Sequence, residues 1–190
     1  MLRPTKAISC AALLCVLALV GCGSSSSTAT NRIPKIAFTS PAITAKTIPV
    51  TYTCDGKDIS PPLEWGAVPP NVSQLALFVL GFIPQPSTKT FKVSVEWALA
   101  GLNPALHRLP PGGVPPGAYV GLTTDKKQRY SICPAHGKTI EYAFELYGLP
   151  SAVTTYKNFQ SVAVLNSLVD RGSATFTNAH GAFAATYKRQ

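Results

Sequence analysis

The chain has 190 residues, a formal net charge of +9 and a hydrophobic fraction of 46%, which suits one globular domain with a sizeable core. Its basic residues are scattered, apart from one short run at 126–129, and they form no stripe interleaved with aromatic residues. We therefore expect no nucleic-acid partner. The positive balance favours either contact with an anionic lipid surface or an ordinary solvated basic face.

Residues 1–21 have the pattern of a bacterial lipoprotein signal peptide. Arg3 and Lys6 precede an apolar run over 7–20, and the sequence Leu-Val-Gly-Cys follows, ending at Cys22. The apolar run is too short for a comfortable membrane-spanning helix and fits an export signal. We expect cleavage before Cys22 and lipidation of its thiol. The alternative is an ordinary signal peptide followed by an incidental cysteine.

The rest of the chain is predicted to be a tether and one domain. Residues 22–34 are rich in serine and cannot pack, so they should form a flexible tether behind the lipid. Residues 35–190 remain as the domain, and the mature chain carries a formal charge of +7. Lipoproteins of this kind carry two or three acyl chains, palmitate among them, which makes attachment stable. We expect a lipid-anchored protein on the extracytoplasmic side of the cell membrane.

The cysteines separate into groups with different expected fates. Cys10 and Cys15 leave with the signal peptide and Cys22 takes the lipid, so Cys54 and Cys133 remain. An even pair in an exported protein predicts a disulfide between them. Such a bond closes a loop of about 80 residues and contributes about 4–5 kcal/mol in the chain-entropy model. The alternative is two separate buried thiols.

Extended segments dominate the domain. The run 74–81 is apolar throughout, as is typical of a strand buried on both faces, and Pro84 and Pro86 are expected to end it. The cleanest alternation of apolar and polar residues lies at 140–148. Strands are predicted, in chain order, at 36–40, 48–53, 74–81, 91–100, 140–148 and 181–187.

One helix and one long loop complete the predicted elements. Residues 157–170 have apolar side chains at helical spacing and end before Arg171-Gly172. Residues 103–130 are rich in proline and glycine, and a loop of this length usually serves a site or is disordered. Because strands dominate without regular helix alternation, we predict a mainly β fold. It should be a sandwich of two mostly antiparallel sheets with a peripheral C-terminal helix.

The stretch 52–65, Tyr-Thr-Cys-Asp-Gly-Lys-Asp-Ile-Ser-Pro-Pro-Leu-Glu-Trp, predicts a tight corner. It should aim the carboxylates of Asp55 and Asp58 at one place. These carboxylates could line a ligand cleft, or Asp58 could satisfy backbone amides in an Asx-type turn. The double proline that follows predicts an edge strand or a loop.

Several motifs in order resemble the phosphatidylethanolamine-binding protein family, in its bacterial Raf-kinase-inhibitor-like group. Residues 52–65 resemble the opening signature, and the turn Cys-Pro-Ala-His-Gly at 133–137 resembles Cys-Pro-Pro-x-Gly. Residues 142–149 resemble the strand Tyr-x-Phe-x-Leu-Tyr-Ala-Leu, and 186–189 resemble the last strand. The resemblance covers about 35–189. It implies a β-sandwich of this family's type with a small anion pocket that accepts phosphate-like groups or lipid headgroups in relatives.

The sequence departs from the family pattern at the expected pocket. Residues 80–83 contain no carboxylate where relatives have Asp-Asp-Pro-Asp-Ala-Pro, and Glu96 and Ile140 replace two histidines. Losing these donors makes a bound phosphate less favourable. Glu96 could be a rim carboxylate or a buried acid paired with Arg or Lys. The candidate ligand-binding residues are Asp55, Asp58, Glu96, Trp97, His136 and Tyr142.

Two functional hypotheses follow. The first is a membrane-anchored binding protein that holds a small anionic ligand or a lipid headgroup non-covalently in a diverged pocket. The alternative is a protein-interaction or inhibitor module that acts through the loop at 103–135. The sequence contains neither a Gly-x-Ser-x-Gly nor a His-Glu-x-x-His motif, and its three histidines lack metal-ligand spacing. We therefore expect no enzymatic activity, no metal and no cofactor.

Overall fold

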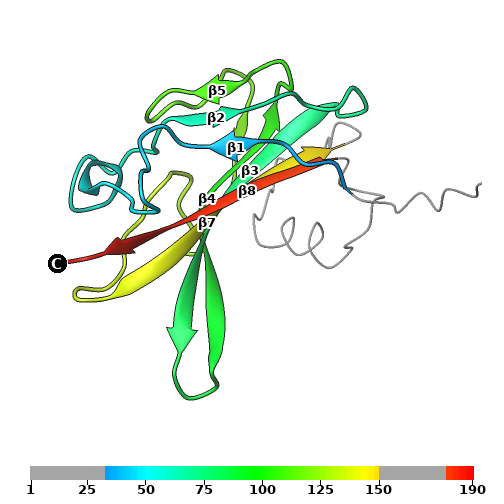
Figure 1. The fold of residues 1–190 in the computed structure, drawn as a ribbon. Helices are drawn as coiled ribbons and strands as arrows, with labels where there is room; N and C mark the ends of the chain where they lie inside the picture. The colour runs from blue at the N-terminus through cyan, green and yellow to red at the C-terminus, as the bar shows by residue number, and fades with distance from the viewer. Residues whose placement is uncertain (1–32, 150–178) are drawn as a thin grey trace, which may run out of the picture. The chain divides into compact units, whose positions relative to one another are not determined.

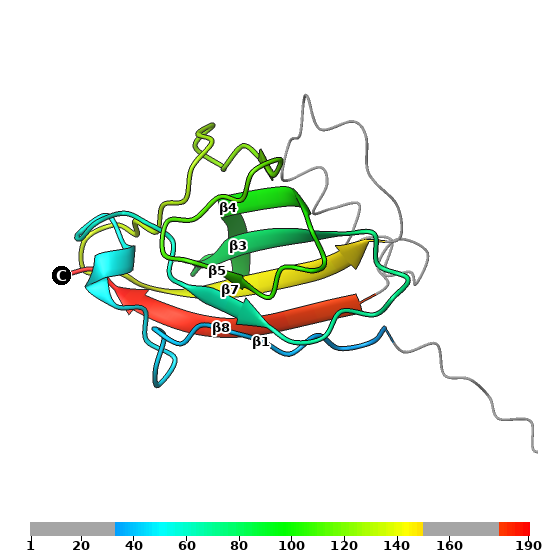
Figure 2. The same ribbon diagram turned by 90° about the horizontal axis from the view of Figure 1, so that it is seen from above.

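The computed structural model describes residues 33–149 and 179–190, which form a sandwich of two antiparallel sheets (Figures 1 and 2). The mainly β fold is therefore confirmed. The predicted helix at 157–170 lies outside the described residues, as do the signal peptide, Cys22 and most of the tether.

The larger sheet has five strands in the order β6-β4-β3-β7-β8. Its members are β3 (Gln74–Gln85), β4 (Thr90–Leu102), β6 (Tyr119–Val120), β7 (Thr139–Leu149) and β8 (Ala179–Lys188). The central strand β3 is buried continuously over 74–81, as its apolar run predicts. The predicted loop at 103–130 is interrupted by β6 and by one strand of the smaller sheet.

The smaller sheet has three strands in the order β1-β2-β5. They are β1 (Phe38–Thr39), β2 (Leu63–Trp65) and β5 (Arg108–Leu109). The segment after the double proline is therefore the middle strand of this sheet, so the prediction of an edge or loop is wrong. Pro61 and Pro62 lie before the first paired residue of β2, and they remove no donor from its ladder.

Residues 48–53 do not form the predicted strand. They contain a 3-10 turn, η1 (Val50–Tyr52), and Thr53 donates both its backbone N–H (3.0 Å) and its hydroxyl (2.9 Å) to the Val50 carbonyl. Only Ile48 joins a strand, through its N–H to the Thr186 carbonyl at 2.9 Å. Local hydrogen bonds therefore override the β-branched composition of this segment.

Pro84 does not end β3, contrary to expectation. The strand continues to Gln85 and pairs with β4 to the tip of a hairpin, whose turn is residues 86–89. The last pair between β3 and β7 is Phe82 with Glu141, so β3 has one unpaired side beyond that point. A proline is tolerated in a strand at such an edge.

The large sheet is buried on both faces. Its buried apolar side chains form two clusters, one on each face. The first cluster fills the space between the sheets, and burying each large apolar side chain there contributes about 1.5–3 kcal/mol. The second lies on the opposite face of the large sheet. Core members of the first cluster are Leu63, Trp65, Leu75, Leu77, Val79, Trp97, Leu99 and Phe144; those of the second include Ala76, Phe78, Leu80, Val95 and Ala98.

Candidate functional site

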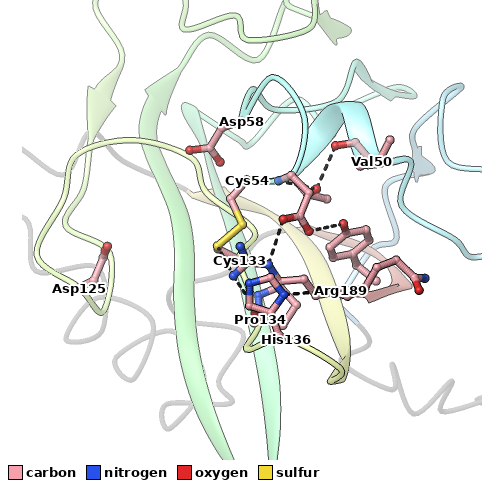
Figure 3. The surroundings of a disulfide bond; sticks show 12 residues. Val50, Cys54, Asp58, Asp125, Cys133, Pro134, His136 and Arg189 are labelled. Carbon is pink, nitrogen blue, oxygen red and sulfur yellow. Dashed lines mark hydrogen bonds and ion pairs between the residues drawn. A yellow bond between two sulfur atoms is a disulfide. The ribbon is translucent and has the colours of Figure 1, made fainter.

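A disulfide joins the corner after η1 to the loop before β7 (Figure 3). The sulfurs of Cys54 and Cys133 lie 2.03 Å apart, and their Cα atoms 5.3 Å apart. The N–H of Cys54 donates to the Ile132 carbonyl at 3.1 Å. The Tyr130 hydroxyl donates to the Tyr52 carbonyl at 2.8 Å. The predicted cysteine pair thus ties together two segments that are far apart in the sequence.

Asp55 binds the C-terminal strand rather than lining a cavity. Its carboxylate accepts hydrogen bonds from the Tyr187 hydroxyl at 2.6 Å and from Arg189 Nε at 3.0 Å. The Tyr187 bond, followed by Arg189, holds the pKa of Asp55 below its ordinary value. His136 lies nearby, with Nδ1 2.8 Å from the Gln190 carbonyl oxygen. This cluster fixes the end of the chain against the corner.

Asp58 has a different partner. Its Oδ2 accepts a hydrogen bond from the Arg129 guanidinium, whereas its Oδ1 is buried without a hydrogen-bond partner among the described residues. Asp55 and Asp58 therefore do not converge on one place. Asp58 and the ring of Trp97 line a hollow of about 210 Å³. Trp97 is almost fully buried and packs edge-on against Tyr130, with ring centroids 5.6 Å apart.

Three polar side chains meet over Gly81 in the centre of the large sheet. The register places Gly81 opposite Ser94 of β4 on one side and opposite Tyr142 of β7 on the other. A Cβ atom on Gly81 would lie 2.7 Å from Ser94 Oγ, 3.0 Å from Glu96 Oε1 and 3.1 Å from Tyr142 Cε1. Only a residue without a side chain fits here, so glycine is what allows the three groups to converge.

The side chains of Glu96 and Tyr142 line a cavity of about 430 Å³, within the range of small-molecule sites. Its other described lining residues are mostly apolar and come from the end of β3, the turn after the disulfide and the start of β7. They are Ile83, Pro84, Pro86, Cys133, Pro134, Ala135, Lys138, Thr139 and Ile140. The cavity can therefore hold an apolar group against two polar ones.

Burial disfavours the charged forms of both polar groups. Burial raises the pKa of Glu96, and the nearby Asp125 carboxylate adds to this, while the Ser94 hydroxyl, which donates to Glu96 Oε1 at 2.5 Å, opposes it. Burial also raises the pKa of Tyr142 well above its ordinary value, and Glu96 contributes. Tyr142 is consequently a phenol over the physiological range.

A second, more polar hollow of about 290 Å³ adjoins the cavity. The two spaces share Ile83, Glu96 and Cys133 in their walls. The remaining described residues of the second hollow are Ser94, Thr123, Thr124, Asp125, Arg129 and Ser131. Glu96 thus lies between an apolar space and a polar one, and its partner is Ser94 rather than the expected Arg or Lys.

The structure divides the sequence-predicted ligand residues into three groups. Glu96 and Tyr142 share the main cavity, and Asp58 and Trp97 share the smaller hollow. Asp55 and His136 lie in the C-terminal cluster instead. Sequence reasoning missed Gly81, Ser94 and Lys138, although a glycine inside an apolar strand is a usable signal of close approach.

The chain belongs to the phosphatidylethanolamine-binding protein family, whose model matches residues 39–188. Among its relatives, a Mycobacterium tuberculosis protein named "Putative lipoprotein LppC" is 29% identical over 167 residues. The match covers 77% of this chain and 80% of that protein. The resemblance at 35–189 is thereby confirmed.

Solved structures agree with this membership. A phosphatidylethanolamine-binding protein homologue from Chlamydia trachomatis superposes with a TM-score of 0.70 and 25% identity, covering 82% of this chain and 99% of the homologue. Escherichia coli YbcL, described as a member of the mammalian family, has the same fold, with a TM-score of 0.67, 20% identity and coverage of 82% and 99%.

Two further properties concern only the part of the chain that the structure describes. Within 33–149 and 179–190, no three His, Cys, Asp or Glu side chains are grouped so that they could hold a metal ion. The same residues include no helix with the length and hydropathy needed to cross a membrane.

Proposed function

We propose that this protein is a lipid-anchored, exported binding protein that holds a small ligand or a lipid headgroup non-covalently. The cavity beside Glu96 and Tyr142 carries the proposal, because it combines a suitable volume with an apolar lining and two buried polar groups. The walls come from β3, β4, β7 and the disulfide-linked turn, so the cavity is held by regular structure.

The lining favours a ligand with an apolar body and a hydrogen-bonding group. Tyr142 can donate through its hydroxyl, and Glu96 offers a carboxyl group whose pKa burial raises. Lys138 is the single cation among the described lining residues. A phosphate would therefore meet one lysine and a nearby carboxyl instead of the two histidines found in relatives. This makes a doubly charged phosphate a less favourable ligand than a neutral or singly charged group.

We propose binding without chemistry, because no histidine is among the described residues that line the cavity. The hydroxyl of Ser94, beside the cavity, is buried and donates a hydrogen bond to Glu96. A buried hydroxyl of this kind differs from the exposed nucleophile of covalent catalysis.

The anchor at Cys22 rests on different support. The signal pattern of residues 1–21 predicts it, and the name of the M. tuberculosis relative describes that protein as a lipoprotein. Mass spectrometry of the mature protein tests it directly. The expected N-terminal peptide begins at Cys22 and carries acyl chains, and an unmodified cysteine would refute the anchor.

Ligand binding is tested by thermal shift against a panel of lipid headgroups, phosphorylated metabolites and small amphiphiles. At least one amphiphile should raise the Tm, and Glu96→Gln and Tyr142→Phe should each reduce that shift. Tyr119→Phe is the matched control, because Tyr119 is about half exposed and does not line the cavity. The proposal fails if no compound shifts the Tm or if the cavity variants respond as the control does.

A second candidate function is the protein-interaction or inhibitor module. The loop between β5 and β7 exposes Val114 (47%) and Tyr119 (48%), which gives a partner apolar contacts. Capture of a partner that survives Glu96→Gln and Tyr142→Phe but is lost when this loop is shortened would favour the module over the binding protein.

A further inference from the structure

The hairpin of β3 and β4 extends beyond the rest of the large sheet. Phe82 is the last residue of β3 that pairs with β7. Among the residues that the structure describes, the two hairpin strands then pair only with each other, as far as Gln85 and Thr90. Figure 1 shows this hairpin as an arm that projects away from both sheets. Its residues 82–93 therefore reach past the layers that bury the other strands.

Apolar side chains gather on one face of this arm. The register pairs Phe82 with Val93 and Pro84 with Phe91, so these four residues alternate onto the same face. Phe91 is 62% exposed and Val93 46% exposed. The Phe82 and Phe91 rings pack edge-on with centroids 6.4 Å apart. The face thus offers contiguous apolar surface, unlike a single scattered residue.

The arm is also basic. It contains Lys89 and Lys92, both exposed, and residues 82–93 include no acidic residue. Lys89 has a φ of +54°, a conformation that glycine or asparagine adopts more easily. A cation therefore occupies the tip although its backbone conformation is unfavourable for a residue with a side chain. Apolar side chains flanked by lysines and free of carboxylates match the chemistry of an anionic lipid interface.

We propose that this hairpin docks on the anionic surface of the bilayer, inserting Phe91 and Val93 between headgroups while Lys89 and Lys92 contact lipid phosphates. By chain statistics, a flexible tether of the length predicted at 22–34 spans roughly 20 Å, short enough to keep the domain within reach of the membrane. The proposal goes beyond ligand binding, and it depends on the proposed function only for the location at the membrane.

Docking would also orient the cavity. Ile83, Pro84 and Pro86 of the same hairpin line the cavity beside Glu96 and Tyr142. Because Ile83 alternates with Phe82 and Pro84, it lies on the other face of the hairpin from Phe91, so docking places the cavity near the lipid surface and not against it.

The test places a fluorescent reporter on the arm. The full chain carrying Phe91→Trp is reconstituted with vesicles of phosphatidylcholine alone or mixed with phosphatidylglycerol, each with brominated acyl chains as quencher. The native tryptophans give a constant background, since Trp65 is 5% and Trp97 1% exposed. Tyr119→Trp is the control, because it puts a reporter on β6 at a position that is also exposed (48%). Thermal melting confirms that each variant is folded.

In anionic vesicles, the Phe91→Trp emission should shift to the blue and be quenched, while Tyr119→Trp should stay in water. Adding Lys89→Gln and Lys92→Gln should lower the ratio of docked to free hairpin about 25-fold at low salt, since each lysine contributes about fivefold near an anionic surface. The proposal is overturned by an unshifted Phe91→Trp emission, by equal quenching in neutral vesicles or at residue 119, or by no effect of the lysines. The proposed ligand binding is measured separately in detergent, so failure of the docking proposal would not refute it.

Discussion

The convergence of side chains over Gly81 can be tested by Gly81→Ala. The added methyl group would lie 2.7 Å from Ser94 Oγ, closer than real Cβ contacts, and at 3.0–3.1 Å from Glu96 and Tyr142. Overpacking of this kind costs about 1–3 kcal/mol. For a domain of this size, the Tm should fall by about 3–10 °C, which calorimetry or circular dichroism measures. Ligand-induced shifts should fall as well, because the displaced groups line the cavity.

A double-mutant cycle separates this contact from a general effect of the methyl group. Ser94→Ala removes the nearest clashing atom, so Gly81→Ala should cost less in its presence than alone. Gly66→Ala is the comparison, because its nearest neighbour, the Ala37 Cβ, lies at 3.3 Å and the change should cost less than about 1 kcal/mol. A Gly81→Ala protein as stable as the wild type, or strictly additive effects in the cycle, would refute the proposed convergence.

Two further predictions concern the pH dependence of stability and the disulfide. Burial raises the folded-state pKa of Glu96 above its ordinary value of 4.5, so the folded protein binds this proton more tightly and loses stability as the pH rises from the unfolded to the folded pKa. Glu96→Gln should abolish that loss, so the free energy of unfolding of the variant relative to the wild type should be higher at pH 8 than at pH 4. The same difference between the two proteins at both pH values, measured by chemical denaturation, would contradict this. Alkylation without reductant should leave Cys54 and Cys133 unmodified by mass, and replacing both with serine should cost about 2–5 kcal/mol in chemical denaturation. Alkylation of either thiol in the exported protein would count against the bond.

The sequence correctly predicted those strands whose position follows from their own residue pattern. The apolar run at 74–81 is buried on both faces, and 140–148 lies within β7. The predicted strand bounds were wrong where a local hydrogen bond formed a turn or where a strand lost its neighbour in the sheet. Residues 48–53 turn because Thr53 satisfies the Val50 carbonyl, and Pro84 stays in β3 because that strand has lost its second neighbour there.

The candidate site was predicted in part, because a site requires registers that no single segment contains. Glu96 and Tyr142 were chosen separately, and the pairing of β3 with both β4 and β7 brings them to one cavity. Asp55 and Asp58 are close in sequence, yet each binds a different arginine that arrives from a distant segment. Their separation could not be inferred from the corner alone.

The sequence by itself determined the family, the mainly β class and the pairing of Cys54 with Cys133, because these follow from ordered motifs, strand periodicity and a cysteine count. Only the tertiary structure decided that Gly81 makes room for Ser94, Glu96 and Tyr142, and that the β3–β4 hairpin continues past the pairing of β3 with β7, with Phe91 exposed. Both depend on strand register, which sets the face that each side chain occupies and where a strand loses its neighbour.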